Sequence, residues 1–345
     1  MRFRYHLDSL IRLARLKFLI YSPVMFTIGT LSAFAQSPER FSPLKYVGGL
    51  LFVYATHIMT HFFNDYYDRH TDAFNIGASA WTGGSRVLPE GRMQPETALW
   101  LGRAMMLFAL TISCFPPFAE ARIFAWATVF FAWAYSAPPL KLEARGLGEF
   151  TVALVLNTLV PILGCSMQGG SIVDPHFLGV LAPLVIIEYV RMMVMNMADV
   201  EADIRVGKTT LVVRLGLKRA IVVHRVGLAL AYATVLIALV WGLSPLTAFC
   251  LWIPLPFGYW LCKRLAHPVW ISDNPFWASQ HNGLSMLMGL VGLGLHHWER
   301  FDIRALLLTY PLVVILFVAP KMIAGGRILL SAPVPTVMAE ERTAA

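Results

Sequence analysis

Charged side chains are scarce in this 345-residue sequence, in which Asp, Glu, Lys and Arg together make up only 14% of the residues. Hydrophobic residues make up 57%, and the mean hydropathy is +0.62. An ordinary water-soluble domain carries about 25% charged residues. The composition therefore excludes a soluble globular protein and indicates a chain that lies in a lipid bilayer.

Several other features are absent. The four cysteines lie inside apolar stretches without metal-type spacing, so neither a zinc site nor a disulfide is expected. Apolar and polar residues do not alternate with period 2, which excludes a membrane β-barrel. Residues 1–26 have a basic start but no convincing cleavage site, so we expect a retained first span rather than a signal peptide. No linker indicates a separate soluble domain.

Apolar stretches that are long enough to cross about 30 Å of hydrocarbon recur along the whole chain. They predict an all-α membrane protein, a bundle of nine or ten transmembrane helices around a central cavity. We expect one domain over residues 1–327 and a disordered tail at 328–345. The predicted spans are 17–36, 44–63, 97–117, 121–137, 149–168, 177–197, 219–242, 244–262, 280–297 and 304–324.

Lysine and arginine are distributed unevenly between the two sides of this predicted bundle. With the N-terminus in the cytoplasm, 20 of the 28 Lys and Arg residues fall in inner segments and five in outer loops. Because positive residues stay on the cytoplasmic side, we expect an integral, multi-pass protein with a cytoplasmic N-terminus. The same bias explains the net charge of +8, and the basic loops are short, so we expect no nucleic-acid partner.

The sequence NDYYDRHTD at 64–72 places three aspartates at the expected cytoplasmic end of an apolar span. A carboxylate at the edge of hydrocarbon is costly unless it is solvated or bound. If the helix continues through this segment, Asn64, Asp68 and Asp72 share one face at spacings of four residues, and Asp65 lies beside them. The helix end would then present a strip of oxygen ligands.

A second sequence, NMADVEADIR at 196–205, repeats this pattern at another inner helix end. Asp199 and Asp203 are four residues apart and Asn196 lies one turn earlier, while Glu201 points to another face. Like charges at this spacing repel each other unless a cation lies among them. A single acidic helix end is usually solvated surface, but two matched clusters on the same membrane side favour a shared site.

Mg²⁺ is the cation that suits such strips best, because it takes octahedral oxygen ligands and is usually held by one or two carboxylates together with substrate phosphates. Two facing strips leave room for a diphosphate, whose charge must be neutralised when its bond to carbon breaks. Basic residues of the inner segments are the candidates for that neutralisation: Arg15, Lys17, Arg86, Lys141, Arg145 and Lys208.

The chain resembles the UbiA superfamily of intramembrane prenyltransferases over most of its length. NDYYDRHTD is similar to the first signature of that family, NDxxDxxxD, and Asp199 and Asp203 followed by GKTTLVVRLG resemble the second. YSAPP and RGLGE, both within 135–149, also look like the family. Within the family, TGGSRVLPEGRMQPE at 82–96 and MQGG at 167–170 are most similar to the menaquinone branch, which prenylates 1,4-dihydroxy-2-naphthoate.

This resemblance implies about nine transmembrane helices around a cavity that opens sideways to lipid, with a Mg²⁺-dependent active site at the cytoplasmic face. An isoprenyl diphosphate would ionise there, and an aromatic, quinone-precursor-like acceptor would capture the prenyl cation. Asn196 and the basic residues would contact substrate, and Tyr66 and Tyr135 could stabilise the cation. The metal ligands would be Asn64, Asp65, Asp68, Asp72, Asp199 and Asp203, of which Asp68, Asp72, Asp199 and Asp203 would be catalytic.

Two departures from the menaquinone pattern leave the acceptor open. MNMAD at 195–199 replaces the NNxRD of that branch, and CSMQ at 165–168 stands where a Tyr-rich stretch is expected. A membrane terpene cyclase, in which the cation is captured by the substrate's own double bonds, is the alternative. A transporter is a third possibility, with Glu188 and Arg191 as a relay, although an internal ion pair also explains that spacing.

Overall fold

The chain is helical for most of its length. The computed structural model describes residues 2–75, 78–267 and 273–297, and these residues form helices, turns and loops without a strand. The predicted all-α architecture is therefore confirmed for this part of the chain. The helices are α1 (Arg2–Ala14), α2 (Tyr21–Gln36), η1 (Pro38–Arg40), α3 (Pro43–Phe74), α4 (Pro95–Ser113), α5 (Ala119–Ser136), η2 (Leu142–Arg145), α6 (Gly148–Leu154), η3 (Val155–Leu159), α7 (Val160–Met167), α8 (Pro175–Arg205), α9 (Leu211–Leu215), α10 (Leu217–Val240), α11 (Pro245–Trp252), α12 (Leu255–Arg264) and α13 (Asn274–His296).

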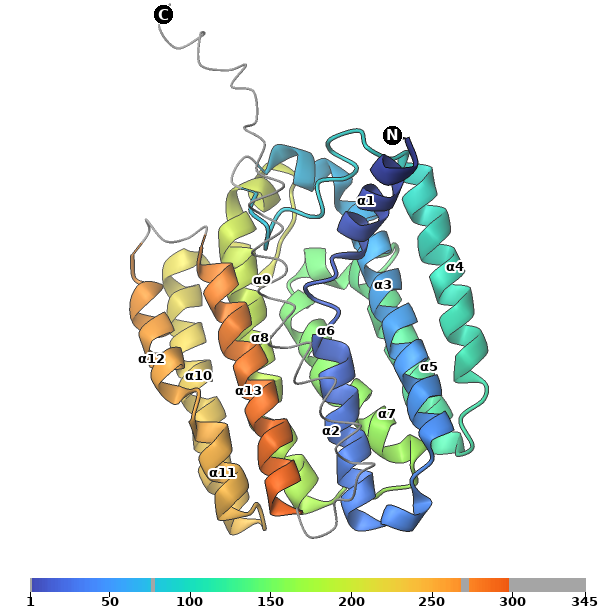
Figure 1. Ribbon diagram of the computed structural model, residues 1–345. Coiled ribbons are helices and arrows are strands. Elements are labelled where there is room, and N and C mark those ends of the chain that lie inside the picture. The colour runs from blue at the N-terminus through green and yellow to red at the C-terminus, as the bar shows by residue number, and fades with distance from the viewer. Residues whose placement is uncertain (1, 76–77, 268–272, 298–345) are drawn as a thin grey trace, which may run out of the picture.

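The long helices lie side by side in one bundle (Figure 1). α1 and the C-terminal ends of α3 and α8 lie at one end, at the top of Figure 1, while the beginnings of α3 and α8 and the end of α13 lie at the other. α3 has 32 residues and α8 has 31, so each is about 47 Å long, which exceeds the roughly 30 Å of membrane hydrocarbon. Each helix is therefore long enough to cross such a layer and to extend beyond it.

Capping residues fix where these two helices begin. The Ser42 hydroxyl accepts a hydrogen bond from the Lys45 backbone N–H at 3.5 Å, and the Asp174 carboxylate accepts one from the Phe177 N–H at 2.8 Å. A proline follows each cap, where its missing N–H costs nothing. With both starts fixed, each helix runs without interruption through its aspartate cluster, as predicted.

Prolines interrupt two of the other predicted spans. The span predicted at 244–262 is divided into α11 and α12 around Pro254, and the span at 149–168 contains the π-helical turn η3 before Pro161 in α7. Proline cannot donate a backbone hydrogen bond and clashes with the preceding turn, so the regular series of helical backbone hydrogen bonds is interrupted at these points. Apolar length predicted the segments but not their breaks.

Within the part of the chain that the structure describes, four segments are long and apolar enough to cross a membrane by length and composition: Gly148–Met167, Pro175–Arg205, Leu217–Val240 and Pro245–Arg264. Nine or ten spans therefore stay a prediction, as does the single domain over 1–327. The predicted span at 304–324 and the predicted tail at 328–345 lie outside the described residues.

The backbones of α2 and α7 approach each other closely. A side chain on Gly29 would collide with the carbonyl of Pro161, and one on Gly164 would collide with the carbonyl of Phe26. Small residues of this kind let helix backbones approach closely within a bilayer. The close crossing fixes α2 against the centre of the bundle, where it forms one wall of the cavity described next.

Candidate active site

A cavity of about 220 Å³ opens among α2, α3, α5, α6, α7 and α8, and both aspartate clusters line it. Asn64, Asp68 and Asp72 reach it from α3, and Asp199 and Asp203 reach it from α8. The two strips predicted from sequence therefore face one cavity. A direct contact joins them, because the Asn75 amide at the end of α3 donates a hydrogen bond of 2.6 Å to Asp199 Oδ1.

Asp68 is the most strongly contacted aspartate of the α3 strip. Lys208 Nζ lies 2.7 Å from Asp68 Oδ1 and 3.1 Å from Glu143 Oε2, and the Asn64 amide donates to Asp68 Oδ2 at 2.7 Å. Burial disfavours the Lys208 ammonium, but Asp68 and Glu143 outweigh it, so the pKa of Lys208 is raised. Burial and the neighbouring Asp68 raise the pKa of Glu143. The Lys208 ammonium thus places one positive charge between two buried acids.

Asp65 does not line the cavity and is held by other residues. It pairs with the Arg15 guanidinium, which also donates to Asn64 Oδ1 at 3.0 Å. The Ser85 hydroxyl and its backbone N–H both donate to the Asp65 carboxylate. Asp65, at 2% exposure, is therefore a buried partner of Arg15 rather than a residue of the cavity wall.

The loop at 82–86 closes over the α3 strip. Gly83 and Gly84 have φ angles of 72° and 75°, which glycine adopts at little cost. A side chain on Gly84 would collide with the Asp72 carboxylate, so the loop backbone packs directly on that acid. Arg86 donates to the Asp72 backbone carbonyl and does not line the cavity. Burial, and then the nearby Asp68, raise the pKa of Asp72.

The α8 strip has uncharged hydrogen-bond partners. Besides its bond from Asn75, Asp199 lines the cavity directly, and Asp203 Oδ2 lies 3.4 Å from the Thr210 hydroxyl. Asn196, one turn earlier, also lines the cavity and donates to Glu149 Oε1 at 2.8 Å. The charge of this strip is therefore less compensated by direct contacts than the charge of the α3 strip.

Of the remaining predicted substrate contacts, Lys17 and Tyr135 line the cavity but three others do not. Tyr66 packs against Tyr67 and Arg69 on another face of α3, because two residues of rotation turn it away from Asn64. Lys141 and Arg145 are exposed, and Arg145 donates to the Pro139 carbonyl at 2.7 Å. The structure does not bring these three side chains to the cavity, so their prediction as contacts finds no support.

Several cavity residues were not singled out from the sequence. His57 and His61 line it two turns and one turn before Asn64 on α3; His57 Nδ1 contacts the Ser22 hydroxyl, and His61 Nδ1 lies 2.7 Å from the Ala14 carbonyl. The helical spacings of three and seven residues, counted backward from Asn64 along the same helix face, would have found both histidines.

Glu188 and Arg191 form the internal ion pair that was the simpler prediction for their spacing. The Asn282 amide also donates to Glu188 at 2.7 Å, and Arg191 lies over the Tyr21 ring at 5.6 Å. Arg191 lines the cavity while Glu188 is fully buried. The pair is held by its own neighbours, which does not favour a proton or ion relay.

The acids of this region exceed the cations that contact them. Five aspartates of this region are buried or line the cavity. Among the described residues, only two ion pairs involve them: Asp65 pairs with Arg15 and Asp68 pairs with Lys208. In the same residues, no three ligand atoms of these acids lie within 4.8 Å of one another. The aspartates carry excess negative charge but do not form a complete set of protein ligands around one point. This arrangement fits Mg²⁺, which keeps several water ligands and also binds phosphate oxygens of the substrate. Asn64, Asp68, Asp72, Asp199 and Asp203 line the cavity, and their role as metal ligands stays a prediction.

Comparison with known proteins agrees with this geometry. The family model described as the UbiA prenyltransferase family matches residues 24–290. The chain belongs to this family. It is 28% identical over 193 residues to the digeranylgeranylglyceryl phosphate synthase of Pyrococcus furiosus, and the match covers 50% of this chain and 63% of that protein. This UbiA-family chain thus matches somewhat under two thirds of that relative's length.

Other relatives extend the comparison. The bacteriochlorophyll synthase 33 kDa chain of Rhodobacter capsulatus is 26% identical over 240 residues, 67% of this chain and 73% of that one. A UbiA homologue from Archaeoglobus fulgidus, solved with GPP and Mg²⁺, has a TM-score of 0.58 at 16% identity and covers 81% of this chain and 99% of that one. The same homologue with DMAPP and Mg²⁺ has a TM-score of 0.61 at 17% identity, over 82% and 99%. These solved structures share the fold of this chain. The names of the Pyrococcus furiosus and Rhodobacter capsulatus relatives do not refer to the menaquinone branch.

Proposed function

We propose that this chain is a Mg²⁺-dependent prenyltransferase that moves an isoprenyl group from an isoprenyl diphosphate to an acceptor at the cytoplasmic face of a membrane. The observation that carries the proposal is the meeting of two aspartate strips, from α3 and α8, at one cavity. Membership of the UbiA prenyltransferase family supports it. Solved structures with the same fold hold GPP or DMAPP together with Mg²⁺.

The proposed roles follow from the positions of the side chains. Asp68, Asp72, Asp199 and Asp203, with Asn64, would hold the metal, while Asp65 positions Arg15. Bound Mg²⁺ would neutralise the diphosphate as its bond to the prenyl carbon breaks. Lys208, Arg15 and Lys17 reach the same cavity and would add positive charge around the leaving group.

We propose an aromatic, quinone-precursor-like acceptor, bound below the aspartates. Tyr21, Tyr135 and Arg191 line the cavity and offer ring faces and a guanidinium to a planar or acidic acceptor. Hydroxyl and imidazole groups are also present there, at Ser22 and His57. Such polar groups would quench a cation that must rearrange within its own chain, so the lining favours transfer over the alternative, a terpene cyclase.

Product analysis tests this function. Purified protein is incubated with Mg²⁺ and isoprenyl diphosphates of several lengths, either alone, with 1,4-dihydroxy-2-naphthoate, or with a glycerol phosphate lipid. We expect diphosphate release to require an acceptor and the aromatic compound to be prenylated. A cyclic hydrocarbon without acceptor would establish the cyclase instead, and prenylation of the lipid alone would replace the aromatic acceptor.

A further inference from the structure

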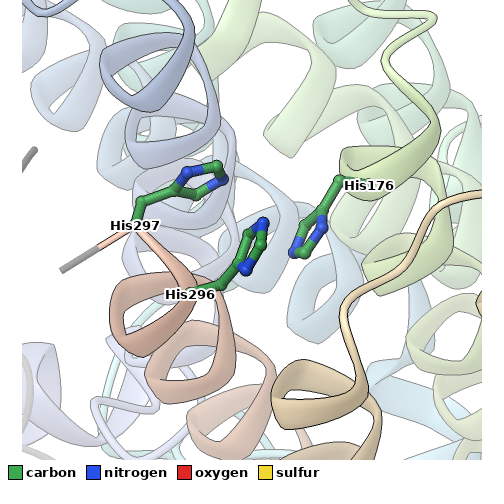
Figure 2. A group of neighbouring side chains, drawn as sticks. All are labelled: His176, His296 and His297. Carbon is green, nitrogen blue, oxygen red and sulfur yellow. The ribbon is translucent and has the colours of Figure 1, made fainter. Parts of the chain in front are cut away.

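Three histidines meet at the end of the bundle opposite to the aspartates. His176 lies in the first turn of α8, and His296 and His297 lie where α13 ends, so the fold joins two helices that are far apart in the sequence (Figure 2). One ligand nitrogen from each ring lies within 4.8 Å of those of the other two. It is the single group of three or more His, Cys, Asp or Glu side chains this close together in the part of the chain that the structure describes.

The three rings are close to an arrangement that one ion could bridge. The rings of His176 and His296 are stacked with centroids 4.4 Å apart, and His297 lies 4.4 Å from His296 and 5.4 Å from His176. Zinc–nitrogen bonds of about 2.0–2.1 Å in a tetrahedral site place two nitrogens roughly 3.4 Å apart. His296 is exposed and His297 half-buried, so modest side-chain rotations would bring the nitrogens to that separation.

His176 is the fixed member of the group. Its Nε2 lies 3.2 Å from the Thr247 hydroxyl, which also donates to the Gly292 carbonyl at 2.9 Å, so α11 and α13 orient the ring together. Its Nδ1 is buried and has no hydrogen-bond partner among the described residues, although the Gly242 backbone lies near the ring. The contact with Thr247 holds the His176 ring in one orientation.

We propose that His176, His296 and His297 form a second metal site, which binds one divalent transition ion of the Zn²⁺ class. Imidazole nitrogen suits Zn²⁺, Ni²⁺ and Cu²⁺, whereas Mg²⁺ takes oxygen ligands, so the two ends of the bundle select different ions. Along α8, His176 lies about 35 Å from Asp199, which places this ion far from the diphosphate. The ion would tie the beginning of α8 to the end of α13.

The test uses the full chain, purified without a histidine tag, treated with chelator and kept in detergent. Co²⁺ is titrated as a spectroscopic probe and then displaced by Zn²⁺. We expect one Co²⁺ per chain, with visible absorption bands typical of low coordination, and a raised unfolding temperature with Zn²⁺. The double variant His296→Gln/His297→Gln should lose at least tenfold in affinity, while His267→Gln, at an exposed histidine elsewhere, should match the wild type.

Two further readouts keep the result unambiguous. The double variant should retain Mg²⁺-dependent diphosphate release, because its changes are remote from the aspartates; if it aggregates, the single variants at the same two positions replace it. Equal Co²⁺ binding by the wild type and the variants would overturn the site, as would wild-type binding weaker than about millimolar. The titration needs no prenyl substrate, so its outcome is independent of the proposed prenyl transfer.

Discussion

Two aspartates of α3, Asp68 and Asp72, line the same cavity as the two aspartates of α8 but have different partners. On α3, Asp68 lies 2.7 Å from Lys208 Nζ, and the neighbouring Asp65 pairs with an arginine. On α8, Asp199 and Asp203 contact an amide and a hydroxyl. Two strips of similar sequence are thus held by different means, one by cations of the chain and the other by neutral groups. The α3 strip is ordered internally, while the α8 strip keeps more uncompensated charge for a metal.

The strongest test of this comparison removes one aspartate from each strip. We expect Asp68→Ala and Asp199→Ala each to lower Mg²⁺-dependent diphosphate release by about 10³-fold, because each removes a proposed ligand of the metal. Both variants should still insert into membranes. Glu201→Ala, at an exposed acid between the two α8 aspartates, is the matched control and should keep wild-type turnover. Near-normal turnover in either aspartate variant would remove the metal assignment.

Replacing the internal cation separates the two strips. Lys208→Met leaves Asp68 and Glu143 buried without their shared ammonium, and an uncompensated buried acid is strongly destabilising. We expect about a 10²-fold loss of turnover together with a lower unfolding temperature in detergent. Lys218→Met, at an exposed lysine of α10, is the control. A Lys208 variant with unchanged turnover and unfolding temperature would show that the α3 strip does not depend on this cation.

A smaller effect is expected where the loop packs on the α3 strip. In Gly84→Ala the new methyl group would collide with the Asp72 carboxylate, so we expect a loss of more than about tenfold in turnover. Gly91→Ala is a close control, because Gly91 also has a positive φ, of 64°, but has no atom within 4 Å of a new Cβ. Equal losses in the two variants would attribute the effect to backbone strain rather than to contact with the acid.

The smallest expected change concerns the bridge between the strips. Asn75→Ala removes one hydrogen bond from a neutral amide to the Asp199 carboxylate, which is worth about 1.5 kcal/mol. We expect roughly a tenfold rise in the Mg²⁺ concentration that gives half-maximal diphosphate release, with little loss of stability. Gln94→Ala, at an exposed amide before α4, should leave that concentration unchanged. A large loss of turnover in the Asn75 variant would mean that the amide contacts substrate itself.

Helix periodicity predicted much of the candidate site. The spacing of Asn64, Asp68 and Asp72 placed them on one face, and the structure keeps that face toward the cavity. The same rule applied to Asp199 and Asp203. These predictions needed only continuous helices, and local sequence specifies a helix well.

Contacts made by loops could not be read in the same way. Lys208 was expected to touch a diphosphate, but its position depends on how the segment after α8 folds back toward Glu143, a residue 65 positions earlier. Lys141 and Arg145, in a comparable loop, turn outward instead. Charge alone does not say which basic residue of a loop points inward, because that choice depends on tertiary packing. The His176 group escaped notice for the same reason, since its members come from distant helices.

The contact between Lys208 and Asp68 also bears on how the protein is made. A chain that enters the membrane before it meets metal or substrate must bury several carboxylates at once, and a buried acid without a partner strongly opposes folding. Arg15 and Lys208 supply positive charge from the chain itself. Two of the five carboxylates, Asp65 and Asp68, therefore have a cationic partner before any metal binds, which lowers the cost of completing the bundle without Mg²⁺.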